Sequence, residues 1–298
     1  MGTSALQWIF PVMIILGLPF SPESPWYLIR QSRIEASSAV LARLGAKNIE
    51  VEVKQLQETI ALEDYYAISS SYMDCFRGTN RRRTAIALMV FVLQQIVGVI
   101  FVLGFSTYFF QLAGFDVARS FDLGVGVTGI GVVGNLAAMF GVNRFGRRSL
   151  FLWGMLGCTV VNLLLGISSF PFTAAARWVQ ASLTLVFALI YQGTIGPLGY
   201  VILSEVPAAK LWSKTVGLGI FLNSICGIIA NIVIPYLVNP NEANLGGKVG
   251  FIFGGLGSGG CVWTRLYIPE TKGKTVAELD QLFEAQVSSR VFDLTSVT

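Results

Sequence analysis

Long apolar stretches alternate with short polar segments along most of the chain. Seven of them contain no Asp, Glu, Lys or Arg except Arg265 near the end of the last: Ala5–Phe20, Thr84–Ala113, Leu123–Val142, Leu150–Phe170, Val179–Leu203, Val216–Val238 and Val249–Ile268. A helix needs about 20 apolar residues to cross the hydrocarbon core of a bilayer. Backbone polar groups in lipid must be satisfied within their own segment. The pattern therefore predicts an all-α polytopic membrane protein, with the first stretch short for a full crossing.

A transmembrane barrel and a signal peptide both fit these stretches less well than spanning helices do. A transmembrane barrel would show alternating segments of about 10 residues, which the sequence lacks. A signal peptide would need a positive first region and a small-residue cleavage site. The first 20 residues instead contain Pro11 and Pro19 and continue into Pro22 and Glu23.

The segment between the first two apolar stretches has a different pattern. In Ala36–Leu44 and Val51–Tyr65, apolar residues recur at i, i+3 and i+4, and charged residues occupy the opposite face. This spacing predicts amphipathic helices. We expect them to form a bundle in water.

Composition narrows the class of protein further. Of the 298 residues, 53% are hydrophobic and only 13% charged, about half the charged share of a typical soluble domain. The chain has no His, and its four cysteines are scattered without metal or redox spacing. No nucleophile–base pair, metal cluster or phosphate loop is evident. The sequence therefore favours a protein that is not an enzyme and that needs no cofactor or metal.

The distribution of Lys and Arg predicts the orientation. If the segment after the first stretch is cytoplasmic, all but three of the 21 Lys and Arg residues lie on that side, the exceptions being Arg119, Arg177 and Lys248. Cytoplasmic loops carry such an excess in multi-pass membrane proteins. We therefore expect a cytoplasmic C-terminus and read the net charge of +4 as a sign of topology rather than of nucleic-acid binding.

Short polar motifs follow the inner ends of the apolar stretches. They read PESP at 22–25, NRFGRR at 143–148, SE at 204–205 and PETKG at 269–273. Arginines and carboxylates at neighbouring helix ends suit interhelical ion pairs. Two further motifs lie inside the stretches, QQIVG at 94–98 and GPLGY at 196–200. In this order, the motifs resemble those of the sugar porter family of the major facilitator superfamily.

The resemblance implies a twelve-span fold made of two six-helix halves. It divides the chain into the end of a sixth span (1–20), a cytoplasmic helical loop (21–83), the six-span C-terminal half (84–268) and a cytoplasmic tail (269–298). The chain then looks like an N-terminally truncated form, that is a fragment, a truncated gene model or a degenerate copy. The alternative is a natural half-size protein that dimerises.

The resemblance also implies a function, carbohydrate transport by alternating access. PWYL at 25–28, CFRGTNRR at 75–82 and YF at 108–109 point to the fungal maltose/α-glucoside permease branch. The expected partners are a disaccharide or hexose, the bilayer of the plasma membrane, and protons as co-substrate in the full-length protein. Because no span here holds an acid, this chain alone is not expected to perform proton symport. The alternatives are an inactive fragment and a transporter-like sugar sensor.

A polar side chain inside a span is costly and needs a reason. Amides both donate and accept hydrogen bonds, and aromatic faces suit sugar rings. By their match to family positions, the candidate substrate-binding residues are Gln94, Gln95, Gln192, Tyr200 and Asn223. Asn135, Asn162 and Asn231 match no such position, so we expect them to join helices by hydrogen bonds.

The inner motifs supply a candidate gating charge network. Its members are Glu23, Arg144, Arg147, Arg148, Glu205, Lys210 and Glu270, and we expect their ion pairs to hold the cytoplasmic side closed. The chain departs from the family at two relevant positions. Ile100 stands where the family has a sugar-binding Asn. Lys210 stands where the family has an Arg, and lysine keeps the charge but cannot form the two parallel hydrogen bonds that a guanidinium makes to a carboxylate.

Overall fold

The computed structural model describes residues 8–170, 173–289 and 292, and within these residues every regular element is helical. The chain divides into two compact units, Met1–Ser70 and Ser71–Thr298. The predicted 21–83 loop is shared between them.

The first unit holds the predicted amphipathic helices. Its elements are α2 (Ile9–Gly17), η1 (Leu18–Phe20), α3 (Pro25–Arg30), α4 (Ile34–Arg43) and α5 (Ile49–Ser69). Their small apolar core consists of Ile29, Leu41, Val53 and Ile60. Arg30 and Glu63 add an exposed ion pair between α3 and α5, with a separation of 2.8 Å. Helices α4 and α5 confirm both amphipathic predictions.

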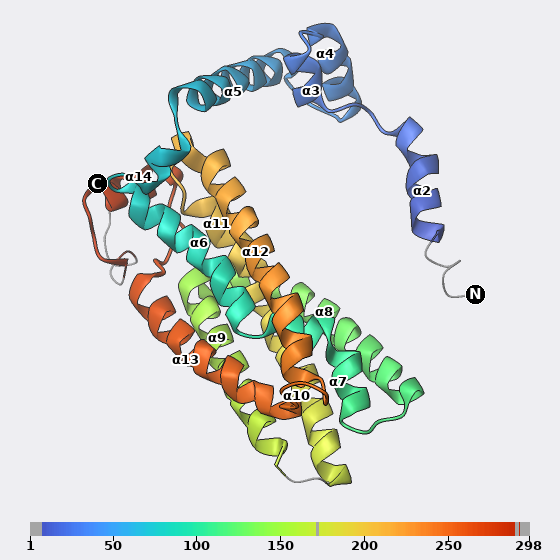
Figure 1. The fold of residues 1–298 in the computed structure, drawn as a ribbon. Coiled ribbons are helices and arrows are strands. Elements are labelled where there is room, and N and C mark those ends of the chain that lie inside the picture. The colour runs from blue at the N-terminus through green and yellow to red at the C-terminus, as the bar shows by residue number, and fades with distance from the viewer. Residues whose placement is uncertain (1–7, 171–172, 290–291, 293–298) are drawn as a thin grey trace. The chain divides into compact units, whose positions relative to one another are not determined.

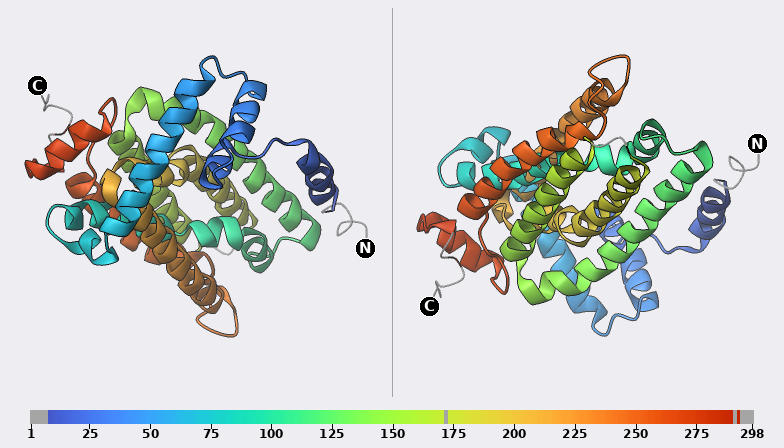
Figure 2. Two further views of the ribbon diagram at one scale, coloured as in Figure 1. Left: turned by 90° about the horizontal axis from the view of Figure 1, so that it is seen from above. Right: turned by 90° about the horizontal axis from the view of Figure 1, so that it is seen from below.

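The second unit is a bundle of long apolar helices (Figure 1). In chain order its elements are η2 (Tyr72–Phe76), α6 (Asn80–Ile96), η3 (Ile100–Gly104), α7 (Ser106–Leu112), α8 (Val117–Phe145), α9 (Arg147–Ser168), α10 (Ala174–Gly193), α11 (Ile195–Glu205), η4 (Ala209–Leu211), α12 (Trp212–Val238), η5 (Gly246–Lys248), α13 (Val249–Tyr267) and α14 (Val276–Glu284). Viewed along the helices (Figure 2), α9 and α10 lie side by side, with α13 against α9 and α8 against α10. Helix α12 packs against α6.

Four helical stretches in the described part of the chain are long and apolar enough to cross a membrane: Val117–Phe145, Arg147–Ser168, Ala174–Glu205 and Ala209–Val238. They correspond to four of the seven predicted spans. The predicted Val249–Ile268 span forms the single helix α13. The outward faces of the bundle are rich in exposed apolar side chains, as lipid contact requires.

The predicted Thr84–Ala113 span is not one continuous helix. Helix α6 ends at Ile96, Gly98 takes a positive φ of 91°, and the chain continues through η3 into α7. A second break separates α10 from α11 at Thr194. Pro197 lacks the N–H that would continue the α10 hydrogen-bond ladder, which accounts for this break.

Candidate functional site

A cavity of about 420 Å³ lies beside the two helix breaks. Helices α6, α8, α10, α11 and α12 and the η3 turn form its wall, with these side chains: Gln94, Gln95, Val99, Ile100, Leu103, Asn135, Tyr191, Gln192, Gly196, Pro197, Tyr200 and Asn223. All five residues predicted to bind substrate are among them. They come from three separate stretches of the sequence, at 94–95, 192–200 and 223, so their meeting in one cavity is a property of the fold.

Gln94 joins the broken helices. Its Nε2 donates to the carbonyl oxygens of Ile195 (2.8 Å) and Gly196 (3.0 Å), in the first turn of α11. A side chain at Gly199 would collide with the Gln94 amide, so glycine there permits the close approach. Gln94 is only 4% exposed. Its amide nitrogen therefore orders the cavity wall rather than presenting a free donor.

Gln95 forms an amide pair across the cavity wall. Its Nε2 donates to Asn223 Oδ1 at 2.7 Å, which links α6 to α12. Gln95 Oε1 is buried and has no hydrogen-bond partner among the described residues. Buried acceptors without partners are uncommon in folded proteins and call for an explanation.

Aromatic and apolar groups complete the lining. Tyr200 is 59% exposed and meets Phe91 edge to face, with 5.2 Å between ring centroids. The stem of Gln192 lies against the glycine positions Gly131 and Gly134 of α8. Ile100, which stands where an amide was expected, contributes an apolar surface to the cavity. The wall therefore alternates amides with apolar and aromatic faces.

The three remaining intramembrane asparagines take different roles. Asn162 is fully buried, and its Nδ2 donates to the Val97 carbonyl at the end of α6 (2.8 Å), which confirms its predicted role between helices. Asn231 is exposed and donates to Gly227 of its own helix, so that prediction was wrong for it. Asn135 lines the cavity. Its spacing along α8 gave no reason to select it, because only the packing of α8 against α10 directs it there.

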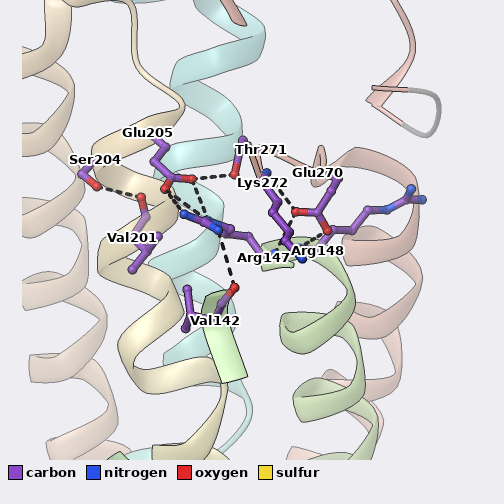
Figure 3. Close-up of polar contacts among 9 residues, drawn as sticks. All are labelled: Val142, Arg147, Arg148, Val201, Ser204, Glu205, Glu270, Thr271 and Lys272. Atoms are coloured by element: carbon purple, nitrogen blue, oxygen red, sulfur yellow. Dashed lines mark hydrogen bonds and ion pairs between the residues drawn. The ribbon is translucent and has the colours of Figure 1, made fainter. Parts of the chain in front are cut away.

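A charge cluster lies at the helix ends away from this cavity (Figure 3). Arg147, at the start of α9, holds Glu205, at the end of α11, by a fork of hydrogen bonds, from Nη2 to Oε1 (2.8 Å) and from Nε to Oε2 (3.2 Å). Thr271 donates its hydroxyl to the second oxygen of Glu205 at 2.6 Å. The Arg147 and Glu205 side chains are 16% and 26% exposed. Such partly desolvated bidentate pairs are stronger than surface ion pairs.

Glu270 accepts hydrogen bonds from backbone N–H groups rather than from an arginine side chain. Its two oxygens accept from the backbone N–H groups of Arg147 (2.8 Å) and Arg148 (3.2 Å), the first two residues of α9 (Figure 3). The helix N-terminus favours a carboxylate there. Gly146, with a φ of 85°, makes the tight turn between α8 and α9, and any side chain on it would collide with Glu270.

The other predicted network members lie around this cluster or apart from it. Arg144 contributes its carbonyl oxygen, which accepts from Lys272 Nζ at 2.9 Å. Arg148 donates from Nη2 to the Arg265 carbonyl at 2.9 Å. Lys210 is exposed on η4. Glu23 belongs to the Met1–Ser70 unit, where it is exposed just before α3. The roles of Lys210 and Glu23 in a network stay predictions.

A second group of arginines, at the start of α6, was not predicted to have a structural role. Arg83 is only 4% exposed and donates to the carbonyls of Val206 (2.7 Å) and Pro207 (3.1 Å). It also forms an ion pair with Asp280 of α14. The only sequence signal was the arginine run at 81–83, which looked like an ordinary topology-setting cluster. Arg83 therefore helps to hold the C-terminal helix, together with Arg82 and the buried apolar side chains of α14.

Replacing Arg147 by lysine should weaken the cluster, because an ammonium group cannot reproduce the fork. We expect the free energy of unfolding of the purified chain to fall by about 1 kcal/mol, measured by thermal unfolding in detergent. Arg144→Lys is the matched control, since the Arg144 side chain is exposed and its carbonyl would persist. Equal effects of the two changes would show that the fork contributes nothing.

Comparisons with known proteins agree with this architecture. The family model described as "Sugar (and other) transporter" matches residues 2–283. The general alpha-glucoside permease of Saccharomyces cerevisiae is 34% identical over 301 residues, which cover 98% of this chain and 49% of the permease. Maltose permease MAL31 of the same species is 30% identical, with the same two coverages. The chain thus spans about half the length of the curated relatives it matches.

Solved structures show the same fold. The proton:xylose symporter XylE bound to 6-bromo-6-deoxy-D-glucose superposes with a TM-score of 0.71 at 23% identity, over 94% of this chain and 58% of the symporter. The inward-open xylose transporter XylE from E. coli gives a TM-score of 0.69 at 21% identity, over 91% and 54%. The predicted fold class, an all-α six-helix part of a major facilitator fold, is therefore confirmed. The chain belongs to the sugar (and other) transporter family.

Proposed function

We propose that this chain supplies the C-terminal half of the substrate path of an α-glucoside transporter, and that the cavity beside the helix breaks binds the sugar. The observation that carries the proposal is the meeting of Gln94, Gln95, Gln192, Tyr200 and Asn223 in one wall. The permease relatives favour maltose or another α-glucoside as the substrate.

The chemistry of the wall suits a neutral polyol. None of the described lining residues is charged. Amides bind hydroxyl groups as donors and acceptors, and an aromatic face covers the weakly apolar side of a sugar ring. The unpartnered Gln95 Oε1 becomes a natural acceptor for a sugar hydroxyl once the Gln95–Asn223 pair adjusts.

Sugar binding by this wall can be measured on the purified chain itself. We expect isothermal titration calorimetry to detect maltose binding, and Asn223→Ala to weaken it about tenfold, because one hydrogen bond is lost and the Gln95 amide loses its partner. Asn231→Ala is the matched control, because Asn231 lies on the same helix but donates only to the Gly227 carbonyl of that helix. The proposal would be contradicted if the two substitutions changed maltose binding equally, or if the chain did not bind maltose at all.

The same proposal includes the orientation of the chain in the membrane and its division into spans, loop and tail. We place 84–268 in the bilayer of the plasma membrane as six spans, with the preceding helical loop and the 269–298 tail in the cytoplasm. The basic residues Arg82, Arg83 and Arg147 all gather at the end of the bundle that holds α14, which supports this orientation.

Alternating access would use the Arg147–Glu205 pair as a gate. The pair bridges the ends of α9 and α11, and α11 also forms part of the cavity wall. Separating α11 from α9 would therefore break the pair and widen the cavity towards the same side. A proton-coupling acid would have to come from outside the described cavity wall, since that wall holds no carboxylate.

A further inference from the structure

A second cavity lies at the opposite end of the bundle. It has a volume of about 460 Å³, and its wall comes from α7, α10, the ends of α9 and α12, and the η5 turn. Helix α9 has 22 residues and runs from the Arg147 cluster to this end, a distance of about 33 Å. The second cavity is thus separate from both the sugar cavity and the charge cluster.

Its lining is cationic. Arg177 and Lys248 both line it, and the described lining contains no Asp or Glu. These are two of the three Lys and Arg residues predicted for the outer side. Neither forms an ion pair with a described residue, whereas the third, Arg119, pairs with Asp116 at 3.5 Å. No described carboxylate is therefore paired with either cation of this cavity.

The two cations are held in place but keep donors available. Arg177 donates from Nη1 to the Gly114 carbonyl at 2.7 Å, and a guanidinium has five N–H donors in total. The Lys248 ammonium lies 5.5 Å from the centroid of the Phe170 ring. Thr173 and Asn244 add a hydroxyl and an amide to the same wall. Such a set of donors around a positive centre suits an anionic oxygen group.

The surroundings place this cavity at a membrane–water boundary. It opens where the apolar helices end and polar loops begin. Trp178 and Phe115 pack edge to face beside it, with 5.1 Å between ring centroids, and Trp178 directly follows the lining residue Arg177 in the sequence. Aromatic side chains of this kind collect at the level of lipid headgroups. The oxygen-rich anion present there at high concentration is the headgroup phosphate.

We propose that this cavity is a phosphate-binding site, occupied by the headgroup of a phospholipid in the leaflet at this end of the bundle. Arg177 and Lys248 supply the charge, and the neighbouring hydroxyl and amide groups supply further hydrogen bonds. The site would anchor the α9–α10 and α12–α13 ends to the lipid surface, so that these helix ends keep their spacing while the opposite ends move.

Native mass spectrometry of the purified full chain in detergent tests this site directly. The probes are phosphatidylglycerol, and a diacylglycerol of the same acyl chains that lacks the phosphate. We expect the wild type to retain phosphatidylglycerol in preference to diacylglycerol. The double variant Arg177→Gln, Lys248→Gln should bind it about 25-fold more weakly, about fivefold for each cation removed. Arg119→Gln should bind like the wild type.

A second titration separates the two sources of phosphate. The thermal unfolding temperature is measured in inorganic phosphate and in chloride at equal ionic strength. If free phosphate also fills the site, phosphate raises this temperature for the wild type but not for the double variant. No response to inorganic phosphate, with lipid retention intact, assigns the site to the headgroup. Equal lipid retention by the double variant and Arg119→Gln overturns the proposal. So does a loss of maltose binding instead of lipid binding, since the cavity would then serve the sugar.

Discussion

Replacing Arg83 by methionine should release α14 from the bundle while the membrane helices stay folded. The Arg83 guanidinium contacts two backbone carbonyls, at Val206 and Pro207, and pairs with Asp280. It also lies over the Phe283 ring, 4.7 Å from its centroid. Removing it leaves both carbonyls and the Asp280 carboxylate without their cation. Arg83 is buried, whereas Asp280 is 34% exposed, so we expect a cost of about 3 kcal/mol, at the low end for breaking a buried pair.

Hydrogen exchange of the α14 amides measures this release. Local opening free energies govern exchange, so a loss of about 3 kcal/mol should speed exchange across α14 at least about a hundredfold. Helix α14 keeps its own start signal, because Thr275 and Glu278 form a capping box. The hydrogen bonds from the Thr275 backbone and hydroxyl lower the pKa of Glu278. The helix itself should therefore persist in part after it leaves the bundle.

Arg81→Met is the matched control for this experiment. Arg81 is two residues away on the same helix, but it is exposed, so its loss should leave α14 exchange unchanged. Similar acceleration in both variants would show that general charge, and not the buried contacts of Arg83, docks the helix. Unchanged exchange in Arg83→Met would contradict the anchoring role outright.

A single methyl group at Gly250 should damage the packing of the whole bundle. Helix α13 lies against α9, and a Cβ at Gly250 would overlap the backbone carbonyl oxygen of Asn162 and lie 2.8 Å from the Gly166 amide nitrogen. Backbone atoms cannot rotate away as a side chain can, so α13 would have to shift as a unit. Small residues allow such close approach of helices in membranes.

We expect Gly250→Ala to reduce the free energy of unfolding by roughly 3 kcal/mol, at the upper end of overpacking costs. The same substitution at Gly255 is the control, because a Cβ there has no neighbouring atom within 4 Å. Gly255→Ala should be neutral or slightly stabilising, since alanine favours helix more than glycine does. Thermal unfolding of both variants in one detergent provides the measurement. A Gly250→Ala variant as stable as Gly255→Ala would show that the α9–α13 contact is not close.

The length of uncharged apolar runs was enough to predict most of the long helices. Apolar runs such as Leu123–Val142 and Leu150–Phe170 become α8 and α9, because an uncharged run of that length has few other ways to satisfy its backbone in lipid. The same pattern failed at Thr84–Ala113. Continuous hydrophobicity does not reveal where a helix breaks, and here the break at Gly98 is held by a partner on another helix, Asn162.

Motif order predicted the residues of the site but not their bonding. Gln94 and Gln95 are adjacent amides with the same chemistry, yet one supports the α11 backbone and the other pairs with Asn223. Glu270 was expected to pair with arginine side chains and instead holds the start of α9 through backbone N–H groups. These differences arise because a side chain's partner depends on which element packs beside it.

The sequence by itself indicated a membrane environment, the fold class, the family and the likeness to fungal α-glucoside permeases. It could do so because composition, apolar run length and ordered motifs can all be read along the chain without knowing which helices pack together. Only the tertiary structure decided the rest. It brought five residues from three separate stretches of the chain, together with Asn135, into one cavity. It joined Arg83 to α14 through Asp280, and it left Arg177 and Lys248 together without a described carboxylate partner. Each of these results depends on contacts between helices, and such contacts leave no periodic signal in any one segment.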